Sequence, residues 1–316
     1  MVGSGVGVTV RLESPIHLGR TFGHIRRGLT DPCCRIDRDD LWIAAWTPAG
    51  SATLHVRSVP SDAAVILNAV GDGTEWLLGR AKRIVGAEDD DQRVGDDPRL
   101  ATYRRSARGM RVVAIGWIHD FALATVLEQR VTTVESRRAW RGLVWRHGTS
   151  ASRVDCGPEL RLAPSPERVA ALPDWEWKRV GVEMRRARTA ATLAAESSRL
   201  ARAADVDREA FRARLRTIRG VGPWTEGWML HFVAGDPDAV PVGDWHIPGQ
   251  IGAALAGEPK ADDARMLELL EPWRGQRARV MRWILGSGNH VPRRAPRAAI
   301  PDRGFGVRRT RYMPIG

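Results

Sequence analysis

One aspartate and a glycine-flanked turn upstream of it are the residues of this 316-residue chain best suited to chemistry. The turn is Gly220-Val221-Gly222 followed by Pro223, a pattern that predicts a helix, a tight turn and a second helix. Because the glycines lack a Cβ, a phosphate could approach the backbone N–H groups where the second helix begins. An ordinary turn between packed helices is the alternative for Gly-Val-Gly alone. Asp244 follows in a loop ahead of another predicted helix.

Two roles fit Asp244. It could simply cap the helix that starts near His246. A carboxylate beside a turn that grips a DNA backbone could instead stabilise the positive charge that develops on a deoxyribose as its base departs. It could also orient or deprotonate the attacking water. His246 could contact a phosphate or serve a structural role.

Tryptophans follow the turn. Trp224 and Trp228 lie four positions apart on the predicted second helix, so both side chains face the same side. Trp273 lies beside a later helix. The chain has 13 tryptophans and 2 tyrosines, and most of the tryptophans belong to the core. A few of them could form an aromatic slot for a flat, extruded base, and a cationic base would gain from the π-faces.

The charge balance favours a polyanionic partner. Lys and Arg number 49 against 37 Asp and Glu, a formal net charge of +12. Nucleic acid is favoured over a membrane, because no long apolar run or basic amphipathic anchor accompanies the charge. Arginine enrichment from a GC-rich genome is the alternative. No leader and no apolar stretch of about 18 residues occurs, which predicts a soluble cytoplasmic protein.

Two regions of different patterning must position these residues. Residues 1–105 alternate apolar and polar positions between turn residues, which predicts an antiparallel β-domain with short helices. Residues 106–286 show helical spacing and short links, so the fold class is α+β with an all-α second domain. The predicted strands are 6–12, 41–47, 52–59 and 63–69. The predicted helices include 73–83, 182–201, 207–217, 224–233, 246–255, 262–270 and 275–285.

The remaining features exclude several classes of site. Residues 287–316 are rich in arginine and proline, which predicts a flexible basic arm that either contacts phosphates or is merely solvated. The three cysteines are too few and badly spaced for a disulfide framework or a four-cysteine cluster. The eight histidines form no pair at ligand spacing, so no metal site is expected.

Residues from about 110 to 286 resemble the helix-hairpin-helix DNA glycosylase superfamily, and in particular its bacterial 3-methyladenine DNA glycosylase II branch. Members of that branch carry an antiparallel β-domain before the helices, as predicted here. Four motifs carry the resemblance: Leu215-x-x-Ile218-x-Gly220-Val221-Gly222-Pro223-Trp224-Thr225, Asp238-Ala239-Val240-Pro241-Val242-Gly243-Asp244, Val126-Leu127-Glu128-Gln129-Arg130-Val131 and Pro272-Trp273-Arg274.

The resemblance implies a role for each matching residue. Asp244 falls on the catalytic aspartate. Gln129 and Arg130 lie where the family fills the gap left by the flipped nucleotide, although a long cation at Arg130 departs from the family's compact apolar wedge. The hairpin that binds the DNA backbone comprises Gly220, Val221, Gly222 and Thr225. The aromatic cleft for the base comprises Trp224, Trp228 and Trp273.

Trp224 bears on the mechanism. In the bifunctional glycosylase/lyase relatives, a lysine two residues after the second hairpin glycine forms a Schiff base with the sugar. Trp224 occupies that position and cannot be a nucleophile, which predicts monofunctional hydrolysis that leaves an abasic site. The resemblance implies no cofactor and no iron–sulfur cluster, and it is compatible with a structural monovalent cation at the hairpin.

The resemblance therefore predicts a monomeric base-excision repair enzyme that flips damaged, alkylated purines out of double-stranded DNA and hydrolyses the N-glycosidic bond. Two alternatives remain open. The chain could be a non-catalytic helix-hairpin-helix protein that binds DNA damage, or a glycosylase for oxidised or deaminated bases on the same scaffold.

Overall fold

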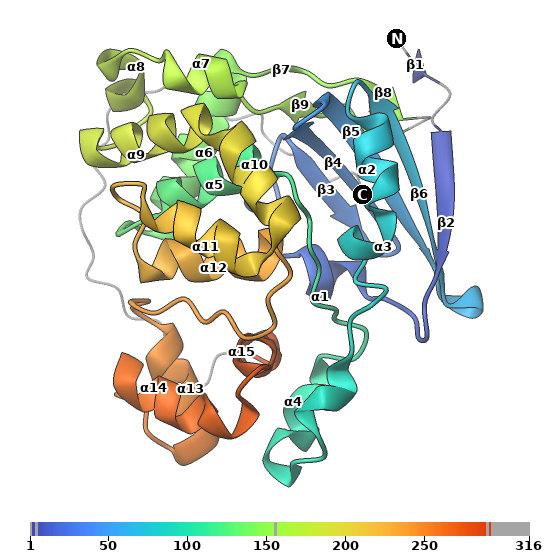
Figure 1. Ribbon diagram of the computed structural model, residues 1–316, viewed down its shortest axis with the longest axis vertical. Helices are drawn as coiled ribbons and strands as arrows, with labels where there is room; N and C mark the ends of the chain where they lie inside the picture. Colours follow the sequence, from blue (N-terminus) through green and yellow to red (C-terminus); the bar gives the residue numbers. More distant parts are fainter. Residues whose placement is uncertain (1, 4–5, 155–156, 289–290, 292–316) are drawn as a thin grey trace, which may run out of the picture.

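The computed structural model describes residues 2–3, 6–154, 157–288 and 291, and in it a β-sheet lies beside a larger group of short helices (Figure 1). This arrangement confirms the predicted α+β class. The five-stranded sheet is antiparallel throughout, in the order β2-β6-β5-β4-β3. Its strands are β2 (Val6–Arg11), β3 (Cys34–Asp37), β4 (Asp40–Thr47), β5 (Gly50–Val59) and β6 (Ala64–Gly71). Residues 292–316, most of the predicted basic arm, lie outside the described residues.

Aliphatic side chains that pair across neighbouring strands stabilise one face of the sheet. Val56 pairs with Leu41 on β4 and with Leu67 on β6, and all three side chains are buried. Such cross-strand pairs are the unit of sheet stabilisation. Three short helices of the N-terminal region cover this face: α1 (Leu18–Phe22), α2 (Thr74–Gly79) and α3 (Ala81–Ile84).

After α6 (Thr133–His147), the chain returns to the sheet and covers part of its other face. Leu160 and Leu162 pack with Ala44 of β4, beside Trp42 and Trp46. The Trp46 indole also donates a hydrogen bond of 2.8 Å to the Ala163 carbonyl. Short strands mark this return, and they pair as β1 (Val2–Gly3) with β8 (Arg153–Val154) and β7 (Thr149–Ser150) with β9 (Arg161–Leu162).

The helical region follows the predicted order. Its helices are α4 (Ala101–Ser106), α5 (Ile118–Glu128), α6 (Thr133–His147), α7 (Pro166–Ala170), α8 (Asp174–Arg179), α9 (Met184–Ala195), α10 (Ser197–Val206), α11 (Arg208–Arg216), α12 (Pro223–Val233), α13 (Ile247–Ala256), α14 (Asp263–Leu270) and α15 (Arg277–Gly286). Short 3-10 helices are η1 (Pro60–Asp62), η2 (Asp91–Val94), η3 (Pro98–Leu100) and η4 (Glu271–Trp273). Within the described residues, no helix is both long and apolar enough to cross a membrane.

Two predicted helices differ from the structure, and the sheet has one strand more than predicted. The predicted helix over 73–83 is broken at Arg80, whose guanidinium stacks on Trp76 and pairs with Asp205. The predicted helix over 182–201 is broken at Glu196, whose carboxylate pairs with Arg214 of α11. These ion pairs join α2 to α10 and α10 to α11, so tertiary contacts override local helix preference. The four-residue strand β3 was not predicted.

The sheet and the helices share their core. The Asp120 carboxylate, in the first turn of α5, accepts a 2.8 Å hydrogen bond from the Trp46 N–H of β4. Burial raises the pKa of Asp120 to about 7. At the far end, α4 extends toward the C-terminal helices (Figure 1), and the Tyr103 hydroxyl donates to the Ala254 carbonyl. The predicted boundary near residue 105 therefore lies in a helix that packs on α15.

Candidate functional site

The glycine turn joins α11 to α12, as the sequence predicts. Gly220 has a φ of +95°, and a Cβ there would lie 2.0 Å from the Thr189 hydroxyl. Only glycine fits this backbone and this contact. Gly222 is exposed at the N-cap of α12, and a Cβ on it would meet no atom within 4 Å. Gly220 is therefore required by the turn, whereas Gly222 leaves the surface open for a ligand.

The turn presents free donors to the solvent. Within the described part of the chain, the backbone N–H groups of Gly220 and Gly222 have no acceptor. Pro223 occupies the first position of α12, where its missing N–H costs nothing. The N-terminus of an 11-residue helix adds its partial positive charge. This geometry suits an anion such as a phosphate.

Two sets of side chains brace the turn. Arg216 of α11 forms two hydrogen bonds, of 2.8 and 3.0 Å, with the Glu226 carboxylate of α12. The Gln129 amide, just after α5, donates to the Gly220 carbonyl at 3.0 Å and to the Thr225 hydroxyl at 2.9 Å. Thr225 is buried. The side chains of Gln129 and Thr225, both predicted to contact DNA, therefore bind each other inside the protein.

Asp244 lies against the start of α12. Its Oδ2 accepts a 2.8 Å hydrogen bond from the Trp224 indole. Its Oδ1 accepts from the backbone N–H groups of His246 at 2.8 Å and Ile247 at 3.0 Å. Asp244 therefore caps α13 as one reading of the sequence predicts, and it also lies beside the hairpin as the other reading predicts. Three donors from two elements fix the orientation of one half-buried carboxylate.

An aromatic stack continues inward from Trp224. Trp228 and Phe232 follow at successive turns of α12, with their rings 5.8 Å apart. The His24 imidazole lies against both, 4.1 Å from the Trp228 ring and 4.9 Å from the Phe232 ring. Phe121 of α5 completes the group, 5.4 Å from Phe232. We call these four residues, His24, Phe121, Trp228 and Phe232, the aromatic cluster.

The N-terminal region supplies part of this cluster, because His24 lies in the loop that follows α1. One buried carboxylate, Asp31, orders the loop by accepting from the Arg27 and Cys33 N–H groups at 2.6 and 3.0 Å. The same carboxylate accepts from the Trp140 indole of α6 at 2.9 Å. These hydrogen bonds attach the loop to the helical region, and His24 on this loop lies against α12.

Two arginines border the aromatic cluster. The Arg27 guanidinium lies 5.2 Å from the Phe121 ring centre and pairs with Glu128 at 2.9 Å. The Arg282 guanidinium lies 4.8 Å from the Phe232 ring centre and donates to the Arg20 and Thr21 carbonyls of α1. Burial, with Arg279 nearby, lowers the pKa of Arg282 to about 10, so it remains charged at neutral pH.

The two histidines at the cluster are neutral. Burial, reinforced by the charges of Arg27 and Arg282, lowers the pKa of His24 well below its usual range. Burial also lowers the pKa of His231 to about 3, with Arg282 as the next cause. His231 Nδ1 lies 2.8 Å from the Asp236 carbonyl, so Nδ1 carries the proton and Nε2 presents a lone pair.

Other predicted site residues lie elsewhere. Trp273 is buried in η4, and the Arg99 guanidinium lies 4.8 Å from its ring centre. In the described part of the chain, no ring contact joins it to Trp224 or Trp228, and its assignment to the base pocket stays a prediction. Arg130 is exposed and has a φ of +55°, a strained conformation for a residue other than glycine. Its role as a wedge stays a prediction.

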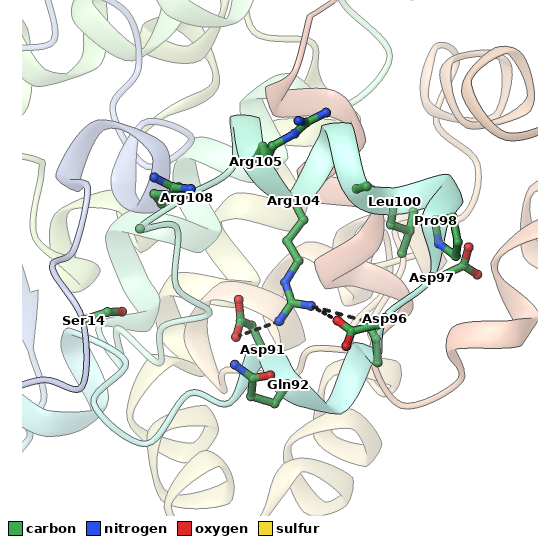
Figure 2. Close-up of a pocket in the computed structure, with 13 residues that line it drawn as sticks. Ser14, Asp91, Gln92, Asp96, Asp97, Pro98, Leu100, Arg104, Arg105 and Arg108 are labelled. Atoms are coloured by element: carbon green, nitrogen blue, oxygen red, sulfur yellow. Dashed lines mark hydrogen bonds and ion pairs between the residues drawn. The ribbon is translucent and has the colours of Figure 1, made fainter.

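A cavity of about 710 Å³ lies away from the hairpin, among η2, η3, α4 and Ser14 (Figure 2). Its central cation, Arg104, pairs with two carboxylates, those of Asp91 and Asp96. Among the described residues, no group of three His, Cys, Asp or Glu side chains could hold a metal ion. The monovalent cation at the hairpin stays a prediction, and one hairpin carbonyl, that of Gly220, already accepts from Gln129.

Sequence reasoning missed His24, Arg27 and Arg282. Each is a single residue without a local motif, and they come together only when α1, α12 and α15 pack. The signal that identifies them is tertiary contact with an aromatic ring: Arg27 lies over Phe121, Arg282 lies over Phe232, and His24 stacks on Trp228 and Phe232.

No protein-family model matches the sequence, and no curated protein matches it significantly. Solved structures do match the fold. The 3-methyladenine DNA glycosylase from Archaeoglobus fulgidus aligns over 88% of this chain and 97% of its own, with a TM-score of 0.73 and 14% identity. The 8-oxoguanine glycosylase/lyase from Clostridium acetobutylicum aligns over 91% and 99%, with a TM-score of 0.67 and 12% identity.

A third structure, of MBOgg1 in complex with a low-affinity DNA ligand, aligns over 90% of this chain and 96% of its own, with a TM-score of 0.67 and 17% identity. These similarities extend through both the sheet and the helices. The chain therefore has the fold of the DNA glycosylases that its motifs resemble.

Proposed function

We propose that this protein is a monofunctional DNA glycosylase, which flips a damaged nucleotide out of double-stranded DNA and hydrolyses its N-glycosidic bond. The observation that carries the proposal is the 2.8 Å hydrogen bond between the Trp224 indole and Asp244. It places one oriented carboxylate directly beside a turn whose free N–H groups suit a DNA phosphate. A module that only binds DNA would need the turn but not the aligned carboxylate.

In the reaction, the bond from the sugar carbon C1′ to the base nitrogen breaks, and its electron pair leaves with the base. Positive charge develops on the sugar, where the Asp244 carboxylate stabilises it. A water molecule then forms the new bond to C1′ and loses a proton, which leaves an abasic site. Because Asp244 is already held by Trp224, His246 and Ile247, little reorganisation accompanies the reaction.

Trp224 also supports hydrolysis without strand cleavage. Solved structures with this fold include a glycosylase/lyase as well as a 3-methyladenine glycosylase, so the fold does not choose between the two activities. A lyase needs an amine nucleophile. The chain has only three lysines, Lys82 on α3, Lys178 on α8 and Lys260 between α13 and α14, and none belongs to the hairpin.

Incubation with damaged duplex DNA tests the proposal. Methylated DNA and duplexes with a single oxidised or deaminated base are treated with the protein, and each sample is then divided between hot alkali and neutral buffer. We expect strand breaks only after alkali, because alkali cleaves abasic sites. Breaks in neutral buffer would contradict the monofunctional assignment, and DNA binding without any base release would identify a damage-binding protein instead.

Asp244 and the hairpin serve any damaged base equally. The resemblance implies alkylated purines, and the alternative is an oxidised or deaminated base. The choice between them depends on the side chains around Trp228.

A further inference from the structure

Polar atoms without partners gather at the aromatic cluster. The side chains that carry them are all more than nine-tenths buried. Native proteins leave few such atoms unsatisfied, and each needs an explanation such as a ligand or an ordered water. Four of them belong to this one region: Arg27 Nη2, Trp228 Nε1, His231 Nε2 and Arg282 Nη1.

Three of the four atoms are donors and one is an acceptor. The arginine and indole nitrogens carry hydrogens and can only donate. The neutral His231 donates through Nδ1 to the Asp236 carbonyl, so its Nε2 accepts. A ligand that satisfied the group would present carbonyl oxygens or ring nitrogens as acceptors, together with an N–H.

The net charge around the cluster is positive. Arg27 is balanced by Glu128, but Arg282 has only backbone carbonyls as hydrogen-bond acceptors. Asp89 also acts electrostatically on Arg282, but its carboxylate is already paired with Arg279. A cationic base stacked on Trp228 would therefore meet an unneutralised guanidinium at short range, where burial weakens solvent screening.

The chemistry of the leaving base agrees with this charge. A purine alkylated at N3 or N7 is a cation and leaves as a neutral molecule, so it gains little from hydrogen-bond donors. A neutral purine leaves with the electron pair of the broken bond, so negative charge develops on its ring nitrogens and carbonyl oxygens. Donors aimed at that charge lower the barrier. Buried arginine and indole donors thus assist the departure of a neutral base.

His24 lies where such a base would stack. Its ring is 4.1 Å from Trp228, at an interplanar angle of 25°, and the side chain is half-buried. Within the described residues it makes no hydrogen bond, so its departure would break only stacking contacts.

Resting on the proposed glycosylase function, we propose that the excised base is a neutral purine with a carbonyl next to a ring N–H. This base replaces His24 against Trp228, and its carbonyl accepts from Arg282 and Arg27. The class includes oxidised and deaminated purines and excludes cationic alkylpurines. This proposal departs from the alkylated substrate that the resemblance implies, which stays a prediction.

Single-turnover release of three bases from otherwise identical duplexes tests the inference. Hypoxanthine and 8-oxoguanine are the neutral probes, and 7-methylguanine is the cationic probe. We expect at least one neutral base to leave about tenfold faster than 7-methylguanine, a difference of about 1.4 kcal/mol in activation free energy. That order is the reverse of their intrinsic ease of departure. Faster release of 7-methylguanine than of both neutral bases would overturn the inference while leaving the glycosylase function intact. If neither these three bases nor any other damaged base is released, the proposed function itself is overturned.

Two variants assign the selectivity to the buried donors. Arg282→Met removes the unpaired guanidinium, and Trp228→Phe keeps an aromatic ring but removes the indole N–H. We expect each to lower the ratio of neutral to cationic release, about tenfold or more for Arg282→Met. Because Arg282 also binds α1, the thermal midpoint of each variant is measured, and Trp228→Phe decides the question if Arg282→Met does not fold.

The matched control is Arg93→Met in η2, where the Arg93 side chain is 74% exposed and pairs with its neighbour Asp90. This control should keep the wild-type ratio. An unchanged ratio in folded Arg282→Met and Trp228→Phe, or an equal loss in Arg93→Met, would overturn the assignment of these donors to the base.

Discussion

The Trp224→Phe variant tests whether the orientation of the Asp244 carboxylate affects base release, without changing the rest of the site. The substitution keeps a flat aromatic ring at the start of α12 and removes one atom group, the indole N–H that donates to Asp244 Oδ2 at 2.8 Å. The hairpin and its bracing residues do not use this N–H. The variant should therefore bind duplex DNA with nearly unchanged affinity but release the damaged base more slowly.

The magnitude follows from the bond that is lost. A hydrogen bond to a charged group contributes about 1.5–3 kcal/mol. If this bond holds the carboxylate in its reactive orientation, the rate constant for base release should fall by about 10- to 100-fold, since each 1.4 kcal/mol is a factor of ten. The backbone N–H groups of His246 and Ile247 remain, so the loss should be smaller than that for Asp244→Asn.

Two assays measure the outcome. Single-turnover base release gives the rate constant, and fluorescence anisotropy of a labelled duplex gives the dissociation constant. A normal release rate in Trp224→Phe would refute the positioning role of the indole. A lower rate that is explained entirely by weaker DNA binding would place Trp224 in the DNA interface and not at Asp244.

Three further predictions follow from other parts of the structure. Gly220→Ala should destabilise the fold by more than about 2 kcal/mol, because a Cβ would lie 2.0 Å from Thr189 at a positive φ. Gly222→Ala should keep the thermal midpoint but weaken DNA binding; equal midpoints for the two variants would contradict this. Gln129→Ala should weaken DNA binding by about tenfold through loss of two hydrogen bonds to the hairpin, read by anisotropy, and unchanged affinity would show that the brace is dispensable. The pKa of Asp120 is about 7 in the folded protein, against an ordinary value of 3.8, so the stability of the wild type falls as the pH rises between these values. Asp120→Asn should therefore be more stable than the wild type at pH 8, by up to about 4 kcal/mol, but not at pH 4. Denaturant unfolding at both pH values measures this, and a pH-independent difference would show that Asp120 does not titrate as the structure indicates.

Local patterns predicted the hairpin and Asp244 because each depends on residues close together in the sequence. Glycine at a left-handed position, proline at the first turn of a helix and an aspartate at a helix cap are all specified by the nearby backbone. The strands of the sheet also followed from alternation, except β3, which alternates over only four residues and is too short to stand out.

Contacts between distant segments were not predictable. Gln129 matches a family position that contacts DNA, yet its amide binds the Gly220 carbonyl 91 residues later. His24 reaches Trp228 only because Asp31 and Trp140 attach its loop to α6. No spacing rule contains such information, since it arises from the packing of one region against another. The residues that we propose to select the base are of this second kind, whereas Asp244, the proposed catalytic residue, is of the first.

We propose that Asp244 is required for base excision but not for DNA binding. Base release by Asp244→Asn is measured on the damaged duplex that gives the most alkali-dependent strand breaks with the wild type. We predict that the wild type forms abasic sites, whereas the variant binds the same duplex with similar affinity and forms none above background. Equal release by the two proteins would contradict the account.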